Sequence, residues 1–160
     1  MTATIPVAPL TAVAFGPYGD VLEIDGPPDK LINAGLCGRF HNRARLDFGD
    51  GRAGICLFDA QPRTLPYRLD LLERHPEGSQ AFVPMHGADW LVIVAADRDG
   101  LPGEPRAFRA TGAQAVNFHR GTWHGVCTPL DTRGLFAVID RIGAGANLEE
   151  HRLAEPRTVA

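Results

Sequence analysis

The stretch Glu73-Arg-His75-Pro-Glu-Gly-Ser-Gln80-Ala-Phe-Val-Pro-Met-His-Gly87 places a carboxylate, an imidazole and an amide directly before an apolar run. A second polar cluster, His119-Arg-Gly-Thr-Trp-His124, follows further along the chain and is also flanked by strand-like sequence. Burying polar side chains costs free energy unless a partner satisfies them. Two such clusters within β-structure therefore favour one shared pocket for a small molecule or a metal ion.

Short segments of β-branched and aromatic residues surround both clusters. They are separated by 13 prolines and 18 glycines, a pattern typical of an all-β sandwich or barrel. We predict a single all-β domain over residues 1–160, built as a small β-barrel with a few short peripheral helices. The expected strands are Gly19–Ile24, Ala53–Phe58, Leu65–Arg74, Gln80–Met85, Leu91–Ala96, Pro105–Arg109, Ala115–Phe118, His124–Cys127 and Leu135–Arg141.

Helical signals are weak and lie near the two ends of the chain. Thr11–Phe15 is long enough for one or two turns. Asn147-Leu-Glu-Glu-His predicts the start of a short C-terminal helix, with Asn147 as its cap and acidic residues in its first turn.

Alternation along the expected strand Leu65–Arg74 indicates which side chains face the interior. The odd-numbered positions form the more apolar face, so a regular strand points Glu73 and His75 the same way as Leu69 and Leu71. Polar groups therefore gather where apolar strands end, as they do at the mouth of a small barrel.

The bulk composition excludes several classes of function. The net charge is −3 and no Lys/Arg-rich stripe is present, which argues against a nucleic-acid partner. The longest apolar run, Trp90–Ala96, is too short to span a membrane, and the N-terminus lacks the basic region of a secretion signal. Cys37, Cys56 and Cys127 have no C-x-x-C spacing, and we interpret them as reduced core residues of a cytoplasmic protein.

The spacing within the two clusters resembles the cupin superfamily. The string Glu73-x-His75-x4-Gln80-x6-Gly87 follows the first cupin motif, with Glu for the first His and Gln for the Glu. The string His119-x-Gly121-x-x-His124 follows the second, with His for the Pro. The resemblance implies a double-stranded β-helix without an organic cofactor. If a metal binds, its ligands would be Glu73, His75, Gln80 and His124, a nitrogen and oxygen set suited to a borderline divalent ion such as Ni, Mn, Fe or Zn.

Beyond this spacing, the amino acids themselves resemble those of the ureidoglycolate lyase family from about residue 8 to residue 145. That resemblance implies a cupin-like barrel, a homodimer, and a carbon–nitrogen lyase that cleaves (S)-ureidoglycolate to glyoxylate and urea in allantoin breakdown. The Glu and Gln departures from the cupin frame match this family's own pattern. The similar stretches are Leu72–Met85, Val116–His124, Val138–Arg141, Phe15–Val21, Ile32–Gly35, Arg39–His41 and Ala60–Pro62.

Such a cleavage needs a base for the substrate hydroxyl, an acid for the departing nitrogen, and a donor site for the carboxylate. His75 and His124 suit the acid and base roles, since imidazole serves both near neutral pH. Glu73 suits orientation of a histidine, proton abstraction or metal ligation. Gln80 both donates and accepts, which suits the substrate hydroxyl or the urea carbonyl.

An arginine matches a carboxylate best because its planar fork donates to two oxygens. Arg141 and Arg39 are candidates for this role, as are Arg120 and Arg63. His119 and Asn33 complete the predicted substrate-binding residues.

Two other readings of the same residues remain open. One is a metal-dependent cupin isomerase or dioxygenase, although iron dioxygenases prefer more histidines than this set holds. The other is a catalytically silent cupin that senses a small carboxylate, which the lack of a DNA-binding segment disfavours.

Overall fold

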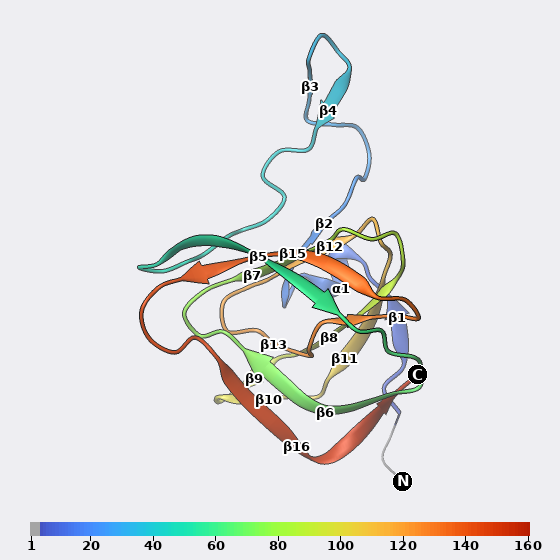
Figure 1. Ribbon diagram of the computed structural model, residues 1–160, viewed down its shortest axis with the longest axis vertical. Helices are drawn as coiled ribbons and strands as arrows, with labels where there is room; N and C mark the ends of the chain where they lie inside the picture. The colour runs from blue at the N-terminus through green and yellow to red at the C-terminus, as the bar shows by residue number, and fades with distance from the viewer. Residues whose placement is uncertain (1–3) are drawn as a thin grey trace.

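Two curved β-sheets face each other, and a hairpin projects from them (Figure 1). The computed structural model describes residues 4–160. The first sheet contains β1 (Val7–Pro9), β6 (Tyr67–Arg74), β8 (Trp90–Ala95), β11 (Arg106–Ala110), β13 (Trp123–His124), β14 (Thr128–Pro129) and β16 (Glu149–Val159). The second contains β2 (Gly19–Leu22), β5 (Arg52–Ala60), β7 (Gln80–Pro84), β12 (Ala115–Phe118) and β15 (Gly134–Ile142).

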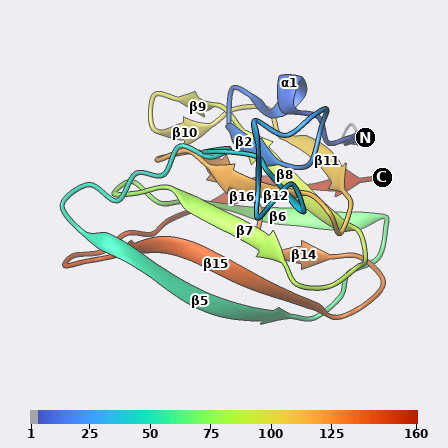
Figure 2. The ribbon, with the colours of Figure 1, turned by 90° about the horizontal axis from the view of Figure 1, so that it is seen from above.

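The order of the strands brings distant parts of the chain together. The first sheet runs β1-β11-β8-β13-β6-β16, with β14 also paired to β8, and the second runs β2-β12-β7-β15-β5. Figure 2 shows β5, β15 and β7 side by side along one layer. The remaining elements are helix α1 (Ala12–Phe15) and two hairpins, β3 (Lys30–Ile32) with β4 (Cys37–Arg39), and β9 (Asp97–Arg98) with β10 (Leu101–Pro102).

Strand β8 is buried on both faces and separates two core clusters. Its residues Trp90, Val92 and Val94 belong to the cluster between the sheets, while its alternate residues belong to the second cluster. The second cluster forms where the first sheet curls until its edges meet, with Ile5 N donating to Thr158 O at 2.8 Å. This closure confirms the prediction of an all-β, cupin-like barrel fold.

Eight of the nine predicted strands coincide with an observed strand, with small differences at the ends, whereas the predicted strand His124–Cys127 overlaps β13 only at His124. The predicted turn at the N-terminus is also confirmed. Helix α1 is capped by Thr11, whose side chain accepts a hydrogen bond from Ala14 N at 3.2 Å. In the described part of the chain, no helix has the length and hydropathy that crossing a membrane requires.

The prediction of a C-terminal helix after Asn147 is wrong. The chain there forms β16, which pairs antiparallel with β6 from Glu149 to Val159. The segment completes the free edge of β6, and Val159 is buried in the second core cluster. An unpaired strand edge and an apolar anchor outweigh the weak local helix signal.

The prediction that all three cysteines lie in the core is wrong for Cys37. Cys56 and Cys127 are half-buried against the cluster between the sheets, but Cys37 is exposed. It lies on the hairpin arm, which we define as residues 29–43 and which stands off the two sheets (Figure 1). The apolar residues beside Cys37 are therefore exposed as well, with Leu36 at 90%.

Candidate functional site

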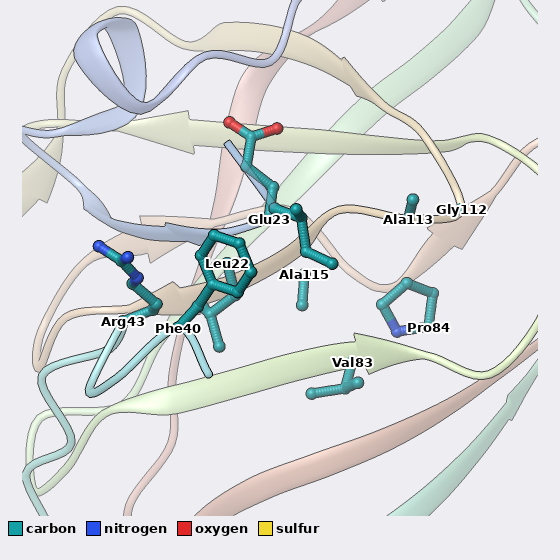
Figure 3. Close-up of a pocket in the computed structure, with 10 residues that line it drawn as sticks. Leu22, Glu23, Phe40, Arg43, Val83, Pro84, Gly112, Ala113 and Ala115 are labelled. Carbon is teal, nitrogen blue, oxygen red and sulfur yellow. The ribbon is translucent and has the colours of Figure 1, made fainter. Parts of the chain in front are cut away.

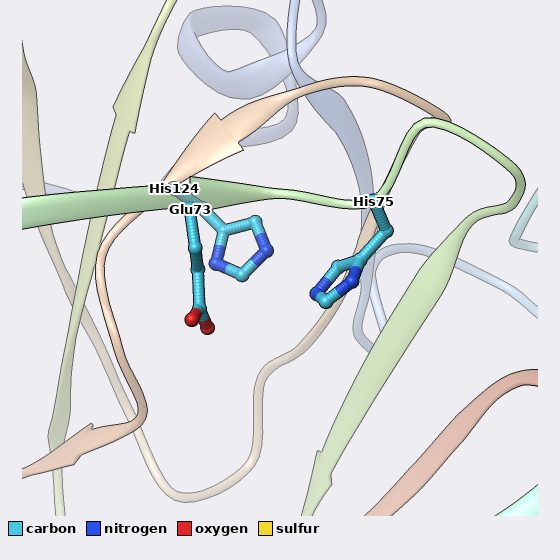
Figure 4. Close-up of side chains that lie close together, drawn as sticks. All are labelled: Glu73, His75 and His124. Carbon is cyan, nitrogen blue, oxygen red and sulfur yellow. The ribbon is translucent and has the colours of Figure 1, made fainter. Parts of the chain in front are cut away.

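Strand pairing brings the two polar clusters of the sequence together. Glu73 on β6 lies opposite His124 on β13, so both side chains project to the same side of the sheet. His75 follows two residues after Glu73 and points the same way. Figure 4 shows the three side chains converging, and one ligand atom from each lies within 4.8 Å of the others.

Both histidines present the same nitrogen toward this cluster. His75 Nδ1 donates to the carbonyl of Asn147 at 2.7 Å, and His124 Nδ1 donates to the carbonyl of Gly125 at 2.9 Å. A carbonyl oxygen only accepts, so the proton lies on Nδ1 and leaves Nε2 with a lone pair in the neutral ring. Both Nε2 atoms are buried and have no hydrogen-bond partner in the protein.

His124 is held neutral by its surroundings. Its side chain is 1% exposed, and the ring of Phe118 stacks on it with centroids 4.3 Å apart and planes within 8°. Burial lowers the pKa of His124 from 6.5 to about 3, which the hydrogen bond to Gly125 only partly offsets. At neutral pH this imidazole therefore offers a lone pair, as a metal ligand or a hydrogen-bond acceptor does.

Burial has the opposite effect on the pKa of Glu73, the carboxylate of the cluster. Desolvation raises the pKa of Glu73, the charge of His75 opposes that rise, and Glu150 on β16 adds to it. The nearby thiol of Cys127 is affected by the same carboxylate, since burial and the Glu73 charge raise the Cys127 pKa to about 12. Glu73 thus takes up a proton more readily than an exposed glutamate, while Cys127 stays protonated.

Gln80 approaches the cluster from the other sheet. It begins β7 and lies opposite Phe118, the residue whose ring stacks on His124. The two side chains share a face of the sheet, so Gln80 points into the interior, where it is 5% exposed. Its Nε2 donates to Asp140, while its Oε1 is buried without a partner.

His119 lies outside this cluster. It follows Phe118 directly and points to the opposite side, where its Nε2 lies 3.1 Å from Asp20 Oδ2. The same carboxylate oxygen accepts from Asn117 at 3.0 Å and from the backbone N–H of Arg45 at 2.7 Å. His119 therefore belongs to a polar network that anchors the chain leading out of the arm.

The remaining predicted substrate residues are also engaged elsewhere. Arg141 donates to Asp50 Oδ1 at 2.6 Å and to the carbonyl of Ala144 at 3.3 Å, with its side chain only 4% exposed. Asn33 and Arg39 lie on the hairpin arm, where Arg39 Nη2 lies 2.8 Å from the Nδ1 of its neighbour His41. None of the three contacts Glu73, His75 or His124.

Two residues that contact the histidines of the cluster were not predicted as site residues from the sequence. Asn147, interpreted as a helix cap, instead accepts from His75 through its backbone and from the N–H of Glu77 through its side chain at 2.8 Å. Phe118 supplies the stacked ring. Its position one residue before His119 signalled only a strand, and no sequence signal pointed to Asn147.

A sequence model of the family described as ureidoglycolate lyase matches residues 2–160. The chain belongs to the ureidoglycolate lyase family. It is 59% identical over 154 residues to a ureidoglycolate lyase of Rhodobacter capsulatus, an alignment that covers 96% of each chain. It is 45% identical over 157 residues to ureidoglycolate lyase 2 of Rhizobium meliloti, covering 97% of this chain and 96% of that protein.

In this member of the ureidoglycolate lyase family, the cluster fits a divalent metal ion. The donors are the carboxylate of Glu73 and the Nε2 atoms of His75 and His124, which have no partner in the protein, and Gln80 on the facing sheet also has an unpaired Oε1. Each histidine also donates its other ring N–H to a carbonyl, as metal-bound histidines usually do. Ligands at about 2.1 Å from an ion are no more than about 4.2 Å apart, so the widest pair would close slightly on binding.

One hollow in this ureidoglycolate lyase family member lies away from the cluster. It has a volume of about 410 Å³ and lies between the base of the arm and strands β2 and β7 (Figure 3). Its wall is largely apolar, with Glu23 and Arg43 as the charged residues, and it includes none of Glu73, His75 and His124. It therefore lacks the paired acid and base groups that the lyase reaction needs.

Proposed function

We propose that this chain is a ureidoglycolate lyase that cleaves (S)-ureidoglycolate to glyoxylate and urea, a step in allantoin breakdown. Family membership over nearly the whole chain supports the substrate. The observation that carries the proposal is the convergence of Glu73 with two histidines whose Nε2 atoms are buried and unpaired. Buried groups without partners are costly, and a substrate or an ion would satisfy them.

The substrate is a carbinolamide, with hydroxyl, carboxylate, hydrogen and ureido nitrogen on one carbon. Cleavage forms the aldehyde C=O as the hydroxyl loses its proton, and the C–N bond breaks as the nitrogen gains one. No nucleophilic serine or cysteine is required. Cys127, whose pKa is raised to about 12 by burial, is poorly suited to such a role.

We assign the proton transfers to Glu73 and His75 and a different role to His124. Glu73 is the strongest candidate for exchanging a proton with the substrate, because burial raises its pKa toward the working range. His75 lies beside it as a second carrier. His124, with a pKa lowered to about 3 by burial, serves better as a neutral acceptor or ligand than as a base.

We further propose that His75, His124 and Glu73, with Gln80 as a fourth ligand, hold a divalent ion such as Ni, Mn or Zn. Such an ion would act as a Lewis acid that stabilises the developing alkoxide. The two lone pairs on Nε2 and the raised pKa of Glu73 favour this assignment, since a nearby cation would offset the cost of burying the Glu73 charge.

We retain Gln80 as a substrate-binding residue, a proposal that its burial opposite Phe118 supports. For Arg141 and His119, a substrate contact would require release from Asp50 and Asp20. For Asn33 and Arg39, it would require the arm to reach the site of a second copy. We infer that these four residues bind substrate only after such a rearrangement.

We propose that the chain forms a homodimer through the outer face of the second sheet. Large apolar side chains gather there on neighbouring strands: Ile55 is 75% exposed, Leu57 67% and Leu135 37%, with Met85 beside Leu135 at 56%. A contiguous apolar face of this kind usually marks an interface. Burying it would remove apolar area from water at roughly 25 cal/mol per Å².

We also infer that the protein works in a reducing compartment such as the cytoplasm. Its three cysteines are all free thiols, and none of them forms a disulfide. Disulfides are common in oxidising compartments and rare in the cytosol.

The test is product analysis with purified protein and racemic ureidoglycolate. A lyase releases urea and glyoxylate in equal amounts and consumes only one enantiomer. An amidohydrolase would release ammonia and carbon dioxide, a dioxygenase would consume oxygen, and a sensor would shift its melting temperature without releasing urea. Any of these three results would contradict the proposal.

A further inference from the structure

Asp140 and Gln80 face each other on the interior side of the second sheet. Strands β15 and β7 pair so that Val138 lies opposite Phe82 and Ile139 opposite Ala81, and the same register places Asp140 opposite Gln80. The alternation on β15 agrees, because Phe136 and Val138 are fully buried in the core between the sheets. Asp140 therefore lies next to the amide that approaches the histidine cluster.

The hydrogen bond between the two residues has only one direction. Gln80 Nε2 lies 3.2 Å from Asp140 Oδ2, and an ionised carboxylate accepts but does not donate. The NH₂ of Gln80 must therefore point to Asp140, and its carbonyl oxygen must point away. That oxygen is buried and has no partner in the protein, although the NH₂ beside it is satisfied.

We propose that Asp140 is a positioning residue that fixes the amide of Gln80 so that only its carbonyl oxygen faces the site. The inference rests on the proposed lyase function for its catalytic consequence. Gln80 then accepts a hydrogen bond, from the hydroxyl or a ureido N–H of the substrate, or ligates an ion. It does not donate to the urea carbonyl, a role that its residue type alone leaves open.

The environment of Asp140 supports this single orientation. Its other oxygen, Oδ1, lies 3.9 Å from the thiol of Cys56, a weak donor. Asp140 is the acceptor in both contacts, and Gln80 is the stronger of the two donors. The ring of Phe118, which lies opposite Gln80 on the other side, offers no competing polar group.

An exchange of the two functional groups tests the proposal. In Asp140→Asn, the new amide both donates and accepts, so Gln80 loses its fixed orientation. In Gln80→Glu, two carboxylates face each other. In the double variant, the amide at position 140 donates to the carboxylate at position 80, and an oxygen again faces the site. Each single change is expected to lower kcat/KM by roughly tenfold to a hundredfold.

The double variant is expected to be more active than either single variant, a rescue that a merely structural role for Asp140 would not produce. Asp59→Asn is the matched control, since it removes a carboxylate from β5 that pairs at the surface with Arg133. It should leave kcat/KM unchanged. A double variant no more active than the singles, or a fully active Asp140→Asn, would overturn the proposal.

A second measurement does not depend on activity. Amide exchange by NMR should show the side-chain NH₂ of Gln80 protected from solvent exchange in the wild-type protein and unprotected in Asp140→Ala. Unchanged protection in that variant would overturn the assigned orientation. A wild-type protein that releases no urea would instead refute the lyase function, while the exchange measurement would still decide how Gln80 is oriented.

Discussion

The rings of His75 and His124 lie with centroids 5.3 Å apart and planes tilted by 34°, and each donates its Nδ1 proton to a backbone carbonyl. Two buried Nε2 lone pairs are thereby directed into one space beside Glu73. Neither histidine is close to the other in sequence. The pairing of β13 with β6 creates the relationship, and the chemistry proposed for this protein depends on it.

Replacing His75 or His124 by Gln should reduce turnover by roughly 10²–10⁴-fold, the range typical of a positioned proton-transfer or ligand group. His119→Gln is the matched control, because His119 contacts Asp20 outside the cluster. Its effect on kcat should be much smaller. Steady-state urea release and melting temperatures for the three variants make the comparison. Equal losses for His119→Gln and His124→Gln would contradict the site assignment.

Acid should destabilise the protein through His124. Its folded-state pKa is lowered to about 3 by burial, so between pH 6.5 and 3 the unfolded chain binds a proton that the folded chain excludes. The contribution is complete above pH 6.5 and is lost as pH falls, by an amount on the order of a few kcal/mol. Urea unfolding at several pH values should show a shallower acid slope for His124→Gln than for wild type. Parallel profiles would contradict the buried neutral state.

Glu73→Gln should separate stability from activity. The folded-state pKa of Glu73 is raised above its unfolded value by burial, so its contribution to stability is present at low pH and is lost as pH rises through the folded pKa. The metal-free variant should therefore unfold at a higher urea concentration than wild type at pH 8, while its turnover falls. A variant that is both less stable at pH 8 and fully active would contradict this account.

Removal of divalent ions should test the ligand set. Calorimetric titration of chelator-treated protein with Ni²⁺, Mn²⁺ and Zn²⁺ is expected to show one site per chain. The affinity should fall in His75→Gln, His124→Gln and Glu73→Gln and should be unchanged in His119→Gln. Identical affinity in all four variants would locate the ion elsewhere, and full activity in metal-free protein would leave the proton transfers to the side chains alone.

Leu57→Arg should disrupt the proposed homodimer. Leu57 is 67% exposed at the centre of the apolar outer face of the second sheet. A charge there costs little in the monomer but is buried without a partner in a dimer. Sedimentation should show a dimer for wild type and a monomer for the variant, whereas Leu101→Arg, on the distant β10 hairpin, should remain dimeric. A monomeric wild-type protein would exclude this interface.

Much of the fold was predictable from the sequence because the patterns that mark strands and turns are local and recur along the chain. Turn residues divided the chain into strands. Period-two alternation was wrong in grouping Glu73 with Leu69, because Leu69 packs with Leu72 in the second core cluster, whereas Glu73 lies opposite His124 on the side of the core between the sheets. The C-terminal strand was misread because its state depends on the free edge of β6, which no local pattern reveals. Cys37 was misplaced because an apolar segment on a projecting arm resembles a core segment in sequence.

The clustering of Glu73, His75 and His124 was predictable from the sequence, but the residues that surround them were not. The spacing of the two motifs predicted that these three residues lie together. They do so because β13 pairs with β6 and places His124 opposite Glu73. The partners that fix them depend on tertiary contacts, such as the carbonyl of Asn147, and these leave no trace in sequence. For the same reason, residue type alone made Arg141 a candidate for binding the substrate carboxylate, although its side chain donates to Asp50 in the fold.

A crystal structure of the protein soaked with glyoxylate would test the central claim most directly. The account predicts that glyoxylate binds between the two sheets, with an oxygen within hydrogen-bond or coordination distance of the Nε2 atoms of His75 and His124. Glyoxylate bound instead in the hollow beside Phe40 and Arg43, with the two histidines untouched, would contradict it.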